Sequence, residues 1–286
     1  MSLLLHGDCL DLMKSIDDNS IDFIFCDLPY GQTNCKWDCC IDLDKFWIEV
    51  MRIKKINTPI FMTTTTKFGV SLINSAPKKC PFRYDLVWVK SAPAGFLSAK
   101  KMPMRKHEMV YCFYEKLPLY DLSSHTHKFI KERDAKQKNG DVYGGEEGKK
   151  LVEGKYDPPL PVSVVKPKVS DSEEETYETC NKPKRKMIYG DMQVFEPKRR
   201  GEPRYEPALP TTMLEIKSTR GKHSTEKPVA LMEWLLKYYS KEGDTVLDPT
   251  MGSGSTGVAC KNMNRNFIGI EKDPEIYEIA VNRIEK

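Results

Sequence analysis

The sequence of 286 residues has no apolar run that approaches the roughly 20 residues a membrane-spanning helix needs. Its first residues, MSLLLHGDCLD, reach an acid within a few positions and do not have the pattern of a signal peptide. We therefore expect neither a membrane segment nor a secretory leader. A hydrophobic fraction of 40% is that of an ordinary globular protein, which can bury a sizeable core at this length.

Paired disulfide or metal-binding motifs are also missing, although the chain contains nine cysteines. An odd number of scattered thiols fits a reducing cytosol better than a disulfide framework. The tightest group, Cys35, Cys39 and Cys40, has neither the CxxC nor the CxxH spacing of a zinc site. We predict free thiols near a loop there, and no metal.

Neither sign of charge is in large excess, because the formal net charge is only +4, but the charged residues are unevenly distributed. Residues 171–178 contain five acids and no base. Residues 182–204 contain three acids and eight bases, Lys182, Lys184, Arg185, Lys186, Lys198, Arg199, Arg200 and Arg204. Such a surplus can neutralise nucleic-acid phosphates, and it is equally typical of a solvated loop. Charge alone leaves both interpretations open.

Hydrophobic periodicity is regular at both ends of the chain and fails in the middle. Short apolar runs at 3–8, 21–26 and 83–90 are typical of buried strands, and 43–53 repeats apolar residues at helical spacing. Strands that alternate with helices predict an α/β domain with a largely parallel sheet. The polar, proline-rich segment 120–215 predicts an insert of mobile loops with room for a hairpin, not a second core.

Regular structure returns after the insert, so the chain divides into 1–119, 120–215 and 216–286. The last part holds a strand, a glycine-rich loop, a helix and another strand, in TVLDPTMGSGSTGVAC and FIGIEKD. Its glycines match the weak pattern G-x-G-x-x-G at Gly252, Gly254 and Gly257. Asp248 adds a negative charge where a pyrophosphate would need none, which favours a ligand with an ammonium group. Glu271, at the end of the next strand, is placed to accept two ribose hydroxyls.

The position of this pattern predicts how the sheet is completed. A glycine loop of this kind normally opens a doubly wound fold, yet here only one helix follows Glu271. The other end of the chain must therefore continue the sheet. We predict that the strand at 3–8, with Asp8 at its tip, lies beside the strand that ends at Glu271.

A second strand, IDFIFC, ends in the loop Asp27-Leu28-Pro29-Tyr30. Asp27 and the Leu28 carbonyl can accept the two hydrogens of an exocyclic amine, and Pro29 stiffens the loop that aims them. Tyr30 offers a flat face on which a flipped base can stack. Four residues alone are as typical of an ordinary Asp-x-Pro turn. Their occurrence together with the glycine loop favours the functional interpretation.

Together these motifs resemble the amino-methylating DNA methyltransferases in the permuted order called the beta class. DLPYGQTNCKWD resembles the catalytic motif, usually DPPY, and HSTEKP at 223–228 the motif before the cofactor strand. The resemblance covers about 3–115 and 210–286. It implies a circularly permuted, Rossmann-like methyltransferase sheet whose first part, 1–119, is the catalytic half. It also implies that 216–286 is the cofactor-binding half and 120–215 an irregular target-recognition insert.

The resemblance also assigns roles to individual residues. The implied catalytic set is Asp27, Leu28, Pro29 and Tyr30. Residues implied to bind S-adenosylmethionine are Asp8, Cys9, Lys227, Asp248, Pro249, Gly252, Ser253, Gly254, Thr256 and Glu271. Within that set, Asp8 would hold the adenine amino group, Glu271 the ribose, and Lys227 would lie near the cofactor carboxylate. The basic stretch supplies candidate DNA contacts at Lys184, Arg185, Lys186, Arg199 and Arg200.

The function that follows is site-specific methylation of adenine N6 in double-stranded DNA, in the setting of restriction-modification. Methylation of cytosine N4 uses the same geometry and stays open, as do a glutamine or RNA methyltransferase and a non-enzymatic module that binds a cofactor or DNA. No Pro-Cys dipeptide is present, which disfavours carbon-5 cytosine methylation. We expect a protein of the cytoplasm or nucleoid, or of the host cytoplasm if its source is viral, and a homodimer is an option.

Overall fold

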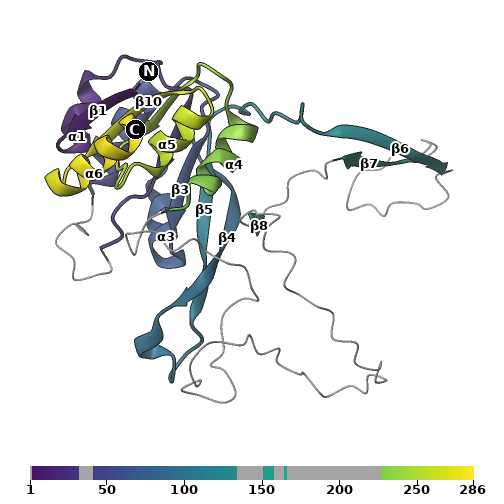
Figure 1. Cartoon of the computed structure of the whole chain (residues 1–286), viewed down its shortest axis with the longest axis horizontal. Coiled ribbons are helices and arrows are strands. Elements are labelled where there is room, and N and C mark those ends of the chain that lie inside the picture. The colour runs from purple at the N-terminus through teal and green to yellow at the C-terminus, as the bar shows by residue number, and fades with distance from the viewer. Residues whose placement is uncertain (1, 32–40, 134–150, 158–163, 166–226) are drawn as a thin grey trace.

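The computed structural model describes residues 2–31, 41–133, 151–157, 164–165 and 227–286. Eight strands form one sheet in the order β1-β10-β9-β2-β3-β5-β4-β8 (Figure 1). These strands are β1 (Ser2–His6), β2 (Phe23–Cys26), β3 (Ile60–Thr64), β4 (Phe82–Ala94), β5 (Arg105–Phe113), β8 (Val164–Val165), β9 (Thr245–Asp248) and β10 (Asn266–Glu271). The six helices within these residues are α1 (Cys9–Leu12), α2 (Leu43–Ile53), α3 (Thr66–Ser75), α4 (Val229–Tyr239), α5 (Ser255–Asn262) and α6 (Pro274–Glu285). Two short 3₁₀ turns are Met13–Ser15 and Phe96–Ser98.

The five strands from β1 to β3 in that order are all parallel, and β5 then runs antiparallel between β3 and β4. The N-terminal strand β1 pairs with β10 along its whole length, from Ser2↔Phe267 to His6↔Glu271. This pairing confirms the neighbour that the position of the glycine loop predicted. The mixed α/β architecture and the largely parallel sheet are likewise as predicted.

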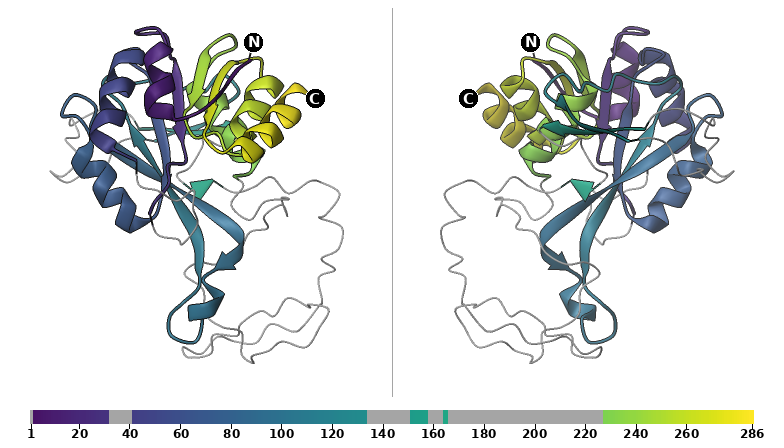
Figure 2. Two further views of the ribbon diagram at one scale, coloured as in Figure 1. Left: turned by 90° about the vertical axis from the view of Figure 1, so that its left-hand side faces the viewer. Right: turned by 90° about the vertical axis from the view of Figure 1, so that its right-hand side faces the viewer.

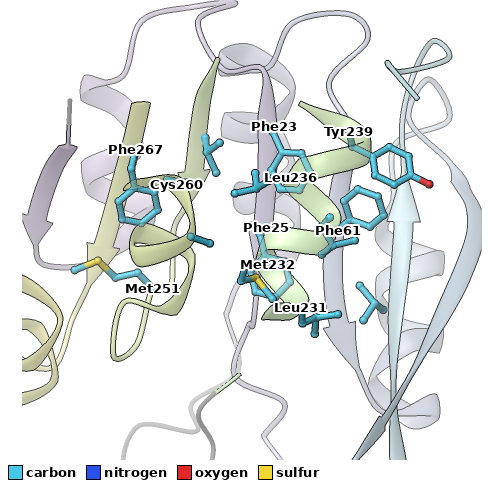
Figure 3. Close-up of a cluster of buried hydrophobic side chains, with 14 of the residues drawn as sticks. Phe23, Phe25, Phe61, Leu231, Met232, Leu236, Tyr239, Met251, Cys260 and Phe267 are labelled. Atoms are coloured by element: carbon cyan, nitrogen blue, oxygen red, sulfur yellow. The ribbon is translucent and has the colours of Figure 1, made fainter. Parts of the chain in front are cut away.

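The core lies on both faces of the sheet because alternate residues of each strand point to opposite sides. On one face, Phe23 and Phe25 of β2 pack against α4 (Figure 3). On the other face, Ile24 and Cys26 pack against α2. All four side chains of β2 are almost fully buried, which explains the unbroken apolar run FIFC. Figure 2 shows α1–α3 and α4–α6 on opposite sides of the sheet.

Part of the predicted insert has regular structure. β6 (Thr126–Arg133) and β7 (Leu151–Asp157) pair as a separate antiparallel hairpin, and β8 joins the main sheet beside β4. The sequence left room for a hairpin but did not place one, because both strands are charged and lack an apolar alternation. Residues 134–150, 158–163 and 166–215 lie outside the described residues, as do Cys35, Cys39 and Cys40.

Helix α4 begins directly after Pro228, which is its N-cap. Five cysteines in the described residues are free and buried: Cys9, Cys26, Cys80, Cys112 and Cys260. None of the helices in the described ranges is both long and apolar enough to cross a bilayer.

Candidate active site

The predicted site residues follow the carboxyl ends of four neighbouring parallel strands. Asp8 follows β1, Glu271 ends β10, Asp248 ends β9 and Asp27 follows β2. Because the carboxyl ends of parallel strands meet at one edge, these acids line the same side of the sheet, where open α/β sheets bind ligands. The fold thus brings residues from both ends of the chain to one edge.

Asp248 organises the glycine loop from inside. The side chain is only 2% exposed, and its Oδ2 accepts a hydrogen bond from the Thr256 hydroxyl at 2.6 Å. Its Oδ1 accepts from the backbone N–H of Thr250 at 3.1 Å. Burial raises the pKa of Asp248 to about 7, although these two hydrogen bonds act in the opposite direction. The expected pairing of Asp248 with a ligand ammonium remains a prediction, and both carboxylate oxygens already bind the loop.

The loop itself requires glycine at two positions. Gly252 and Gly254 have φ angles of 51° and 84°, a region that residues with a Cβ rarely adopt. A Cβ on Gly254 would also lie 2.9 Å from Ile284 of α6. Nothing lies within 4 Å of the position that a Cβ on Gly252 would take. The loop therefore leaves space above Gly252 that a ligand can occupy.

Glu271 contacts the glycine loop directly, and Asp8 follows β1, the strand that pairs with β10. Glu271 Oε2 accepts from the N–H of Gly252 at 3.0 Å, and its Oε1 accepts from Asp273 at 2.9 Å. Asp8 caps α1 by accepting from the N–H of Leu10 at 2.9 Å. Its second oxygen lies 3.0 Å from the ammonium of Lys272. Two anionic acceptors beside an open glycine loop fit the hydroxyl and amine donors of an adenosine group, so these residues fit S-adenosylmethionine.

Other predicted cofactor residues support the loop in different ways. Arg283 donates to the Ser253 carbonyl at 3.2 Å and to its hydroxyl at 3.1 Å. Pro249 lies between Asp248 and the loop. Burial, with the negative charge of Asp8, raises the pKa of Cys9 to about 12, so this residue stays a neutral thiol. Its contribution is packing, not charge.

Asp27 receives hydrogen bonds from three side chains. Its Oδ2 lies 2.5 Å from the ammonium of Lys227, and its Oδ1 accepts from the hydroxyl of Tyr30 at 3.1 Å. The hydroxyl of Thr63, in β3, also donates to Oδ1. Burial and the negative charge of Asp27 raise the pKa of Tyr30 well above its usual value, so Tyr30 remains a neutral donor. The Tyr30 ring lies 5.2 Å from the ring of Phe68, measured between centroids.

The loop Asp27-Leu28-Pro29-Tyr30 is also anchored by a buried side chain. Leu28 is 2% exposed and belongs to the core cluster packed on α1–α3. Where the resembled motif has a second proline, this chain therefore anchors the loop by burying a leucine. At position 28 the loop is held by packing in place of a fixed φ angle.

Lys227 connects Asp27 with a second acid, Glu108 of β5. The Lys227 ammonium lies 3.7 Å from Glu108 Oε2, and its side chain is 11% exposed. Burial lowers the pKa of Lys227, but the charges of Asp27 and Glu108 outweigh it, so the pKa rises and the ammonium stays protonated. Glu108 also pairs with Lys90 of β4. Within the described residues, Glu108 Oε2 is buried without a hydrogen-bond donor.

In the structure the Lys227 ammonium contacts Asp27 and Glu108. Its assignment to the cofactor carboxylate stays a prediction. Thr63, Glu108 and Lys90 were not identified from the sequence. A signal existed for Thr63, because two threonines, Thr63 and Thr64, end the otherwise apolar strand IFMTT. Glu108 carried no such signal within its charged neighbourhood.

Lys184, Arg185, Lys186, Arg199 and Arg200 lie outside the described residues, so their predicted contacts with DNA stay predictions. No group of three or more His, Cys, Asp or Glu side chains in the described ranges could hold a metal ion.

Comparison with known proteins places this site in a family. The chain is 34% identical to the type II methyltransferase M.HinfI of Haemophilus influenzae, over 99% of this chain and 68% of that protein. It is 45% identical to M2.DpnII of Streptococcus pneumoniae over 71 residues, which are 25% of this chain and 26% of that protein. The alignments with the first relatives thus span about a quarter of their length.

Two solved structures share the fold. The complex of M1.HpyAVI with S-adenosylmethionine has a TM-score of 0.55 at 19% identity, covering 99% of this chain and all of that chain. The cytosine-N4-specific PvuII DNA methyltransferase has a TM-score of 0.58 at 13% identity, covering 99% and 86%. The DNA methylase family profile matches residues 21–282. The chain therefore belongs to the DNA methylase family of N6-adenine and N4-cytosine type, whose cofactor is S-adenosylmethionine.

Proposed function

We propose that this protein transfers the methyl group of S-adenosylmethionine to the exocyclic N6 of adenine in double-stranded DNA. The observation that carries the proposal is the position of Asp27, whose carboxylate stands at the sheet edge that also bears the glycine loop. An anionic acceptor there can bind the hydrogens of an amine. The family membership makes that amine one of a DNA base.

The catalytic residues act mainly by positioning and by charge. The target base leaves the duplex stack, because its amine is not accessible within it. Asp27 and the Leu28 carbonyl accept the two amine hydrogens and orient the nitrogen, while the Tyr30 ring supports the base. The nitrogen gains positive charge as it is methylated, so the fixed negative charge of Asp27 stabilises the transition state. Bound S-adenosylmethionine supplies an electrophilic methyl group on a positively charged sulfur.

Lys227 must release Asp27 for this arrangement to form. Its ammonium occupies Asp27 Oδ2 at 2.5 Å, where an amine hydrogen would bind. Glu108 Oε2, at 3.7 Å from the same ammonium, offers a second anionic partner. A small rotation of the flexible lysine side chain exchanges one carboxylate for the other. Glu108 is therefore a positioning residue that frees Asp27 for the base.

Methylation of cytosine N4 is the second candidate, because a cytosine amine presents the same two hydrogens to Asp27 and Leu28. The aspartate of the DLPY loop favours adenine, following the resemblance to the adenine enzymes. An RNA or glutamine methyltransferase fits less well, since an asparagine is more usual at position 27 for glutamine.

One experiment identifies the methylated base. Plasmid DNA is incubated with the protein and S-adenosylmethionine carrying a deuterated methyl group, digested to nucleosides and analysed by mass spectrometry. We expect labelled N6-methyldeoxyadenosine, and none with Asp27→Ala as the matched control. Labelled N4-methyldeoxycytidine would select the second candidate. Label in RNA or protein but not in DNA would contradict the proposal.

A further inference from the structure

The β4–β5 hairpin extends from the same edge of the sheet as the candidate active site. β5 is antiparallel to β3, and β4 is antiparallel to β5, so β4 runs in the direction of β3 and ends at the edge near Asp27. Its pairing continues through Val89↔His107 and resumes at Ala94↔Arg105. Figures 1 and 2 show the end of this hairpin projecting well beyond the helices that cover the sheet.

The hairpin tip, residues 94–105, is an ordered turn that presents apolar side chains to solvent. Gly95, with φ of 91°, begins the 3₁₀ turn Phe96–Ser98, and the Ser98 carbonyl accepts from Lys101 at 2.8 Å. Phe96 is 58% exposed, Leu97 99% and Met102 60%. Single exposed apolar residues are common, but three within seven positions on a projecting turn form a patch.

Basic residues surround this patch. Between positions 90 and 107 the sequence contains no acid and five bases, Lys90, Lys100, Lys101, Arg105 and Lys106. The side chains of Lys101 and Arg105 are exposed beside the apolar turn. The hairpin thus combines positive charge on its arms with apolar groups at its end. At its base, Lys90 pairs with Glu108, which faces Lys227.

We propose that the hairpin tip binds duplex DNA next to the target base, with Lys101 and Arg105 on phosphates and with Phe96 and Leu97 inserted as an apolar wedge. The inference rests on the proposed function, in which duplex DNA is the substrate. A duplex has a charged exterior and an apolar base stack, which matches the order of groups along the hairpin. A two-stranded ribbon is also narrow enough to enter the major groove.

The position of the hairpin tip is a second reason to expect duplex DNA as its partner. The tip begins about 10 Å beyond the Trp88↔Glu108 pair, at roughly 3.3 Å per residue over the three residues of β5 from Glu108 to Arg105. Trp88 is buried in the core, whereas the tip stands clear of it. DNA that presents a base to Asp27 must pass along this edge, so the tip is within its reach. An apolar side chain inserted into the duplex stabilises the unstacked state that base flipping requires.

The phosphate contacts are tested with Lys101→Glu/Arg105→Glu and a labelled mixed-sequence duplex. We expect binding to weaken at least about ten-fold, and the slope of log affinity against log salt to fall by roughly 2, near 0.9 for each lost contact. The matched control is Lys78→Glu/Lys79→Glu, which reverses two exposed bases between α3 and β4, at the opposite edge of the sheet. Equal slopes and affinities for both double variants would overturn the proposal.

The wedge is tested with Phe96→Ala/Leu97→Ala, against Ile48→Ala, which removes an apolar side chain 66% exposed on α2. We expect methylation of plasmid DNA to slow by about ten-fold, with an unchanged salt slope and unchanged binding of S-adenosylmethionine. Sedimentation is measured in parallel. A lower oligomeric mass with unaltered DNA binding would assign the patch to a second copy of the chain and overturn the inference.

Two patterns of results distinguish a wrong function from a wrong role for the hairpin. If the wild-type protein neither binds the duplex nor methylates plasmid DNA, the proposed function is wrong and the hairpin inference falls with it. If the wild type methylates DNA and both hairpin variants match it, only the hairpin inference is wrong.

Discussion

The two ends of the active-site edge hold their carboxylates in different ways. At the glycine-loop end, Glu271 accepts from two backbone N–H groups, and Asp248 from one N–H group and one buried hydroxyl. At the catalytic end, Asp27 accepts from the side chains of Lys227, Thr63 and Tyr30. The donors to Glu271 and Asp248 are held by the fold of the loop. The donors to Asp27 include the ammonium of Lys227, whose flexible side chain can move away. The comparison indicates a preformed cofactor end and an exchangeable catalytic end.

The largest effect is expected at the exchangeable end. Replacing Asp27 with alanine removes the acceptor for the base amine and the charge that stabilises the transition state. We expect methyl transfer to fall by roughly 10³-fold or more, measured in single-turnover reactions. Asp27→Asn keeps one acceptor oxygen and should lose less. Equal loss in both variants would mean that the charge, and not the acceptor geometry, carries the effect.

Glu108→Gln tests whether the ammonium exchanges partners. Without the negative charge of Glu108, Lys227 binds Asp27 more tightly and competes with the base. We expect kcat to fall roughly ten-fold, the size of one charge-assisted hydrogen bond, with unchanged affinity for S-adenosylmethionine. The matched control is Glu115→Gln, which removes an acid paired with the buried Lys54 at 2.8 Å, at the other end of β5. An unaltered kcat in Glu108→Gln would argue that Lys227 never leaves Asp27.

The raised pKa of Asp248, at the glycine-loop end, predicts that the stability of the protein depends on pH. The pKa of Asp248, about 7 in the folded protein, exceeds its ordinary value of 3.8, so the folded state binds a proton that the unfolded chain releases between about pH 4 and 7. Stability is therefore lost as the pH rises through that window. Asp248→Asn removes this dependence. Denaturant titrations from pH 5 to 8 should show wild type losing up to a few kcal/mol relative to the variant. Parallel curves would show that Asp248 ionises normally.

The smallest effect is expected for Asp8→Asn. Asparagine still caps α1, so only the ion pair with Lys272 is lost. The side chains of Asp8 and Lys272 are 38% and 75% exposed. Exposed pairs contribute about 1 kcal/mol or less. We expect a shift in thermal unfolding of a few degrees at most and a few-fold weaker cofactor binding. A loss of cofactor binding as large as that of a Glu271 variant would make Asp8 a principal contact.

Local motifs predicted much of this site, because each is a strand followed by a functional turn. The placement of β1 beside β10 could also be predicted, since the glycine loop lies too late in the chain to build a sheet by itself. Contacts between segments that are distant in the sequence could not be predicted. Thr63 and Lys227 reach Asp27 across 36 and 200 residues, and no local pattern reports such pairings.

The sequence did not show how Asp248 is held. Its carboxylate accepts hydrogen bonds from Thr250 and Thr256, which only the folded loop brings together. The hairpin β6–β7 was also hard to place, because charged residues interrupt both strands and leave no apolar alternation in the sequence.

The central claim is that the two ends bind different ligands, and calorimetric titration of S-adenosylmethionine into Asp27→Ala and Glu271→Ala tests it most directly. We predict that Asp27→Ala binds the cofactor within a few-fold of wild type while transferring no methyl group. Glu271→Ala should bind it more weakly by up to about 3 kcal/mol, the value of one set of hydrogen bonds to a charged group. Loss of cofactor binding in Asp27→Ala, or unchanged binding in Glu271→Ala, would contradict the account.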